Sequence, residues 1–120
     1  KPEFGDATEH SAKEPLYDLS LLKTMSRGNE DFVKKMVSIF VNLVEENTES
    51  LEKAIESDDI ETIKKIAHKI KPSIDQMGIV SLKEVVREVE KFDTITGSKE
   101  NLTASVRNII RVLREVKSQL

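Results

Sequence analysis

One histidine stands inside a short basic segment of the sequence. From Ile60 to Pro72 the chain carries four lysines and one glutamate, whereas the whole chain of 120 residues has a net charge of −3. On a helix, Lys64, His68 and Lys71 share one side, because residues three, four and seven apart lie on the same face. The positions that flank this stripe are also basic and add to a field that attracts anions: Lys65 and Lys69.

An exposed imidazole with ammonium groups near it is able to accept a phosphoryl group. The neutral ring attacks through Nε2, and the phosphoryl group brings about −1.5 to −2 charges and three acceptor oxygens. Lys71, one turn after His68, is placed to neutralise that charge. Pro72 and Ser73 are small and leave the ring accessible. The segment predicts a phosphoryl carrier. The sequence contains no glycine-rich phosphate loop, so we expect no nucleotide site in this chain.

The composition excludes several other kinds of chemistry. With no cysteine and two histidines, the chain has neither a disulfide framework nor the four Cys or His ligands of a structural zinc site. The longest apolar stretch, Met36 to Val44, is interrupted by polar residues and is far shorter than the roughly 20 residues of a membrane span. We therefore expect a soluble single domain with no metal or cofactor of its own.

Helical periodicity covers the chain from Leu16 onward and supplies the elements that must position the histidine. A short helix capped by Asp18 and ended by Gly28 is expected first, followed by longer helices over 29–57, 59–78, 81–96 and 99–120. The expected caps are Asn29, Asp58 with Glu61, Ser81 with Glu84, and Ser98, and Gly78 is expected to end the helix that carries His68.

The apolar positions of these helices each form one stripe. In the helix over 29–57 the stripe is Phe32, Met36, Ile39, Phe40, Leu43, Leu51, Ala54 and Ile55, and in the last helix it is Leu102, Val106, Ile109, Ile110, Leu113 and Val116. The predicted fold class is all-α, an antiparallel up-down-up-down four-helix bundle with a short extra N-terminal helix.

Residues 1–15 lack any apolar period. They mix charge, glycine, proline and small polar residues, which predicts a flexible tail, a linker or the remnant of a tag, followed by a bundle domain over 16–120. The second histidine, His10, lies in this tail and is given no role.

The segment around His68 resembles a known signature. The run A-H-K-I-K-P-S-I-D-Q-M-G, residues 67–78, is similar to the motif of histidine-containing phosphotransfer (HPt) domains, roughly A-H-x-L-K-G-x-x-x-x-h-G with h apolar. The long helix and connector that precede it also look like that family, so the resemblance covers about residues 16–118. It implies that His68 accepts the phosphoryl group, that Lys71 stabilises it and that Gly78 closes the helix.

Two positions depart from the family pattern. Pro72 stands where the family most often has glycine, and it removes the N–H that would bond the carbonyl of His68, which predicts a kink just past the site. Glu90 stands where some members of the family present glutamine toward the phosphoryl group. We assign Glu90 no role in binding phosphate.

The resemblance also implies partners. A response-regulator receiver domain, carrying a phospho-aspartate and its own Mg²⁺, is expected to dock at His68 on exposed apolar residues: Met25, Ile66, Ile79 and Val80. No nucleic acid, no direct membrane contact and a monomeric state are expected. The expected compartment is the cytoplasm, and the linker-like residues 1–15 favour a C-terminal domain of a membrane-bound hybrid sensor kinase over a free-standing protein.

The net charge and the helical pattern of the chain, taken without the resemblance, also permit two other functions. One is a non-catalytic helical adaptor, a pseudo-HPt module that binds a partner without being phosphorylated. The other is a structural bundle that dimerises. His68 discriminates between carrier and adaptor, because an adaptor tolerates its replacement and a carrier does not.

Overall fold

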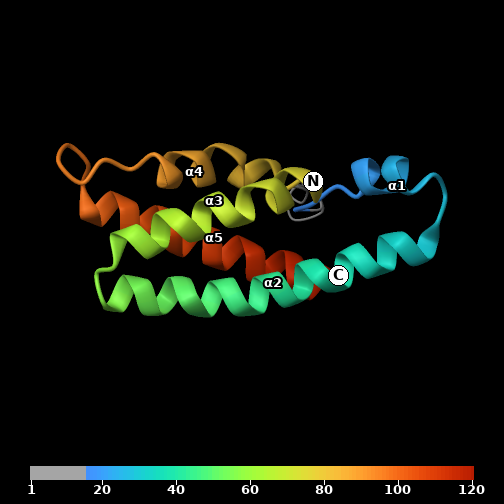
Figure 1. Cartoon of the computed structure of the whole chain (residues 1–120), viewed down its shortest axis with the longest axis horizontal. Helices are drawn as coiled ribbons and strands as arrows, with labels where there is room; N and C mark the ends of the chain where they lie inside the picture. Colours follow the sequence, from blue (N-terminus) through green and yellow to red (C-terminus); the bar gives the residue numbers. More distant parts are fainter. Residues whose placement is uncertain (1–15) are drawn as a thin grey trace, which may run out of the picture.

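The computed structural model describes residues 16–120 of the chain. Within this range the chain forms five helices and no strand: α1 (Ser20–Ser26), α2 (Glu30–Glu56), α3 (Ile60–Gln76), α4 (Val80–Glu90) and α5 (Lys99–Gln119) (Figure 1). The expected tail, with His10, lies outside the described residues. The all-α prediction is confirmed.

Helices α2 to α5 form a four-helix bundle. Both α3 and α5 pack against α2 and against α4, so the four helices enclose one core. The connections between successive helices are short, as expected for antiparallel neighbours. Figure 1 shows α2 as the long edge of the molecule, with α1 beside its N-terminal half. No helix in residues 16–120 has the length and apolar character needed to cross a membrane.

The core is built from the predicted apolar stripes. All six apolar positions expected in α5 are buried, and α3 contributes Ile63, Ala67, Ile70 and Ile74. Ile39 is the exception, since its side chain is 49% exposed. The adjacent residue Phe40 is buried, so this level of α2 is covered and Ile39 lies outside the buried face of the helix.

Two of the predicted N-caps are confirmed. Asn29 accepts a hydrogen bond from the Phe32 N–H at 3.2 Å, and Ser98 accepts one from the Asn101 N–H at 3.3 Å. These side chains satisfy backbone donors that the first turn of a helix leaves without a partner.

Three of the predicted caps are wrong. Asp59, not Asp58, caps α3 by accepting from the Thr62 N–H at 3.2 Å, because Asp58 has a φ of +58° in the preceding turn. Helix α4 begins one residue before Ser81, and its cap position, Ile79, makes no side-chain cap bond. Asp18 lies one residue before the cap position of α1, although it still accepts from the Ser20 N–H at 2.8 Å.

Gly78 ends α3 as predicted, and the structure adds a second reason for glycine. Its φ is +63°, which an L side chain rarely adopts. A Cβ at this position would also lie 2.7 Å from the Asp18 carbonyl oxygen. The Asp18 N–H donates to the Met77 carbonyl at 2.8 Å, so the segment before α1 is fixed to the end of α3.

The first and last described residues lie beside each other. The Tyr17 hydroxyl oxygen lies 3.4 Å from the carbonyl oxygen of Gln119, near the end of α5. The two ends of the described range therefore lie within side-chain reach of each other.

Candidate functional site

His68 lies on the outer face of α3, where the helix packs beside α4. The buried side of α3 carries isoleucine and alanine, and the spacing of these residues leaves position 68 on the opposite side. The His68 side chain is 72% exposed. The prediction of an accessible imidazole is confirmed.

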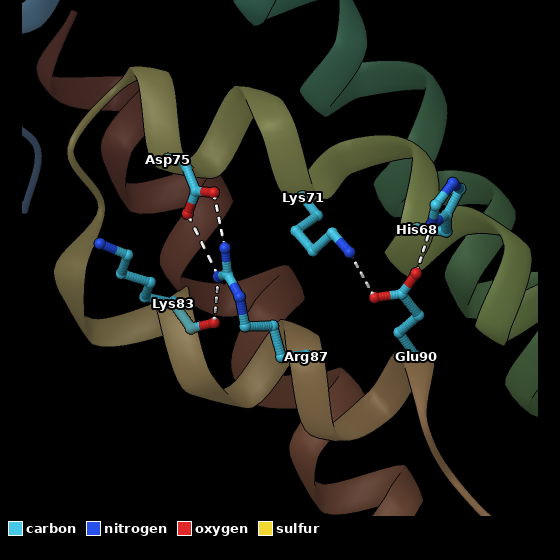
Figure 2. Close-up of polar contacts among 6 residues, drawn as sticks. All are labelled: His68, Lys71, Asp75, Lys83, Arg87 and Glu90. Atoms are coloured by element: carbon cyan, nitrogen blue, oxygen red, sulfur yellow. Dashed lines mark hydrogen bonds and ion pairs between the residues drawn. The ribbon is translucent and has the colours of Figure 1, made fainter.

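Glu90, the last residue of α4, contacts His68. Its Oε2 atom accepts a hydrogen bond from His68 Nδ1, and Figure 2 shows the other ring nitrogen on the side of the ring away from Glu90. The Glu90 side chain is only 20% exposed, so the contact joins an exposed ring to a largely buried carboxylate side chain.

This contact fixes which ring nitrogen carries the proton. An ionised carboxylate has only acceptor atoms, so Nδ1 must be the donor. In the neutral ring Nε2 then holds a lone pair. The arrangement presents Nε2, a nitrogen that can act as a nucleophile, to solvent. The contact between Glu90 and Nδ1 orients the ring.

The same carboxylate also binds Lys71. The Lys71 ammonium donates to Glu90 Oε1 at 2.7 Å, so Glu90 joins two residues of α3 that lie one turn apart (Figure 2). The hydrogen bond from Lys71, and after it the one from His68, lowers the pKa of the Glu90 carboxyl below its usual value. Glu90 is therefore ionised at neutral pH, as the hydrogen bond to His68 Nδ1 requires.

A second ion pair joins α3 to α4 farther along the same face. The Arg87 guanidinium donates to both oxygens of Asp75, at 3.2 and 2.7 Å, and also to the Lys83 carbonyl at 2.8 Å. The hydrogen bond from Arg87 lowers the pKa of Asp75. This two-bonded pair holds the helices in register and so keeps Glu90 opposite His68.

The remaining basic residues surround the ring. Lys65 and Lys69 are exposed, and Lys64 is half-buried one turn before His68. None of these three lysines forms an ion pair with another residue of the described range. Pro72 is exposed and Ser73 is half-buried, and α3 continues through both to Gln76.

Two of the residues expected on the docking surface are buried instead. Ile66 is 8% exposed and Ile79 is 1% exposed. Ile66 follows Ile63 and precedes Ile70 on the core side of α3, and Ile79 is drawn into the core where its N–H donates to the Ile74 carbonyl. The other two expected residues are exposed, Met25 by 51% and Val80 by 77%.

Sequence reasoning missed the part that Glu90 plays. His68 and Glu90 are 22 residues apart, which no single-helix periodicity connects. The available signal was the turn between the two helices: in an antiparallel pair, residues at equal distance from the turn face each other, and Ile79 lies midway between His68 and Glu90.

Within residues 16–120, no group of three or more His, Cys, Asp or Glu side chains is placed to hold a metal ion.

The comparisons with known proteins identify the family. The model of the Hpt domain family matches residues 35–119, well over half of the chain, and His68 is the one histidine in that range. Comparison with curated proteins and with solved structures gives no match. The chain therefore belongs to the Hpt domain family, whose members are phosphoryl carriers that exchange the group with receiver domains in His-Asp phosphorelays.

Proposed function

We propose that Nε2 of His68 is the atom that carries the phosphoryl group in this chain. The observation that supports this most directly is the contact of Nδ1 with Glu90, which leaves Nε2 as the free, solvent-facing nitrogen. His10, the other histidine of the sequence, lies before the range that matches the family.

The transfer step needs no redox change and no added proton. The Nε2 lone pair forms a bond to phosphorus while the bond from phosphorus to the aspartyl oxygen of the receiver breaks, and the electron pair of that bond stays on the aspartate carboxylate. The ring keeps its Nδ1 proton, and Glu90 stabilises the positive charge that develops on the imidazole. The reverse step returns the group to an aspartate.

Lys71 is the proposed partner of the transferred group. The Lys71 side chain is 27% exposed, and its ammonium group binds the same carboxylate as His68, so it is held near the ring before any phosphoryl group arrives. A phosphoryl group brings more negative charge than the single carboxylate and competes for the ammonium. Lys64, Lys65 and Lys69 contribute a longer-range attraction for the phosphorylated partner.

The proposed partner is the receiver domain of a response regulator. That domain supplies the aspartate and Mg²⁺, and the carrier supplies the imidazole, so we assign no cofactor to this chain. Met25 and Val80, the two predicted docking residues that are exposed, are the proposed apolar contacts, and Met25 also lies against Gln76 at the end of α3. We place the relay in the cytoplasm, where ATP feeds such pathways, and assign the domain to a hybrid sensor kinase. The proposed carrier is a monomer and contacts neither nucleic acid nor membrane.

The test is phosphoryl transfer from a labelled receiver domain with Mg²⁺. The native chain should take up label that is acid-labile and base-stable, as expected for phosphohistidine. His68→Gln should take up none, and because the replaced side chain is exposed, its circular dichroism and Tm should match those of the native chain.

His10→Gln is the matched control and should accept label at the native rate. Label on His68→Gln would overturn the assignment of the acceptor. A native chain that accepts label from none of several receivers would favour the adaptor function instead.

A further inference from the structure

Pro72 acts on the backbone of the phosphoryl-accepting residue. It lies inside α3, four positions after His68. In an α-helix the N–H of residue i+4 donates to the carbonyl of residue i, and proline has no N–H. The carbonyl that loses its donor is that of His68 itself. In helices generally, a proline ring also crowds the carbonyl of residue i−4, which here is the same carbonyl.

The turn that contains this carbonyl faces solvent. The His68 side chain is 72% exposed, and both Lys69 and Pro72 are exposed. Lys71 binds Glu90, Arg87 binds Asp75 and the Lys83 carbonyl, and no side chain of residues 16–120 donates a hydrogen bond to the His68 carbonyl. The His68 carbonyl therefore lacks its α-helical i+4 donor and any side-chain donor from the described residues, and it keeps the capacity to accept from a partner.

The core does not require proline at this position. The side chains of α3 that fill the core are Ile63, Ile66, Ala67, Ile70 and Ile74. Position 72 lies on the exposed side, where alanine would complete the helix and proline is the least favourable residue. Pro72 destabilises the helix by removing the hydrogen bond to the His68 carbonyl, and the core gains nothing in return. This points to a function for that carbonyl.

We propose that the carbonyl oxygen of His68 is a docking acceptor for the receiver domain, kept available by Pro72. A hydrogen-bond donor at the rim of the receiver's active site, either a backbone amide or an ammonium group, binds this oxygen when the aspartyl phosphate reaches Nε2. The inference rests on the proposed function, because it requires the receiver to dock at His68. Two contacts on one residue, at the ring and at the backbone, define the direction of approach.

The test uses two substitutions that restore the missing N–H, Pro72→Ala and Pro72→Gly. In both, the KM for the phosphorylated receiver should rise about two- to tenfold, the size of one ordinary hydrogen bond, with kcat close to native. Phosphorylation by phosphoramidate, a small donor that needs no docking, should be unchanged. Alanine and glycine differ in helix propensity, so an effect that acts through stability would separate the two variants.

A spectroscopic measurement tests the contact itself. The ¹³C resonance of the His68 carbonyl should shift on addition of unphosphorylated receiver to the native chain. In Pro72→Ala the resonance should already be shifted in the free protein, and the receiver should add little.

The outcomes separate this inference from the proposed function. An unchanged KM in both variants, or a native carbonyl resonance that does not respond to the receiver, overturns the docking acceptor while phosphoryl transfer to His68 stands. Loss of phosphoramidate reactivity in both variants also overturns it, since Pro72 would then set the pose of the ring. A native chain that accepts no label from any receiver overturns both.

Discussion

Two faces of this bundle carry ion pairs between helices, and they differ in what the carboxylates hold. On the face between α2 and α5, Arg114 binds Glu52 at 2.8 Å and Lys117 binds Glu45 at 3.3 Å. On the face between α3 and α4, Glu90 binds Lys71 at 2.7 Å and also His68. Both faces are charged, and of these two the second connects its carboxylate to an imidazole.

The two carboxylates also differ in exposure. Glu52 is 44% exposed and its partner Arg114 is 50% exposed, so solvent and salt screen the pair on both sides. Glu90 is 20% exposed, while the ring it holds is 72% exposed. The α3–α4 face therefore has a protected carboxylate behind an exposed ring, whereas both partners of the α2–α5 pair are exposed.

After the loss of His68 itself, the largest expected effect on transfer follows the removal of Glu90. Glu90→Ala frees the His68 ring to rotate and to exchange its proton between the two nitrogens, so transfer from the receiver should slow by about tenfold to a hundredfold. Glu52→Ala, the matched change on the other face, should leave the rate within about twofold of native. Equal rates for the two variants would remove the distinction between the faces.

A change at the turn between α3 and α4 should affect stability more than transfer. Gly78→Ala places a Cβ at a φ of +63° and against the Asp18 backbone, so unfolding should become easier by at least about 1–2 kcal/mol. Gly28→Ala is the matched control, because its φ is +89° but nothing lies within 4 Å, and it should cost only the backbone strain, about 1 kcal/mol.

Denaturant unfolding measures both losses, and transfer per folded molecule should stay native in each glycine variant. A transfer defect in Gly78→Ala at full folding would show that the end of α3 controls the Glu90 contact.

Acid should affect both faces in the same way. The pKa of Glu90 is lowered from its usual 4.5 by the hydrogen bonds from Lys71 and His68, and that of Glu52 is lowered from 4.5 by the hydrogen bond from Arg114. A carboxyl whose pKa is lowered in the fold stabilises it above its unfolded pKa, and this contribution disappears as pH falls through the folded value. Glu90→Gln and Glu52→Gln should each lose stability less steeply than the native chain as pH drops below 4.5. Denaturant titrations at several pH values measure the slopes, and unchanged slopes would contradict the assigned pairs.

The smallest effect is expected from Arg114→Ala. It removes an exposed pair on the α2–α5 face, so the unfolding midpoint should move little and transfer should not change. Raising the salt concentration should reduce even that small difference. A clear loss of transfer in this variant would mean that the two faces are coupled through the core.

The sequence predicted the fold and the exposure of His68, because both follow from periodicity within single helices. The burial of the α5 stripe and the caps at Asn29 and Ser98 are of this kind. What it missed depends on how helices meet. The partnership of Glu90 with His68 requires the register of α3 against α4, and the burial of Ile79 depends on the turn between them. The burial of Ile66 is different, because its spacing from Ile63 and Ile70 already places it on the core side of α3.

The cap errors also come from contacts outside the single helix. Asp58 and Asp59 are adjacent and chemically identical, so the choice between them is made by the left-handed turn at Asp58 and its ion pair with Lys99 at 2.7 Å. Ser81 with Glu84 fits a capping pattern, but the burial of Ile79 starts α4 earlier. In both places a tertiary contact decided between sequence patterns of nearly equal merit.

The meeting of Tyr17 and Gln119 has a consequence for how this bundle combines with other sequences. Because residues 16 and 17 lie within side-chain reach of Gln119, the bundle has the geometry of a module that can be inserted into a loop of a host protein. Such an insertion needs only short connecting segments, and closing a short loop costs little entropy. The host would gain a phosphoryl-carrying module without any rearrangement of its own fold.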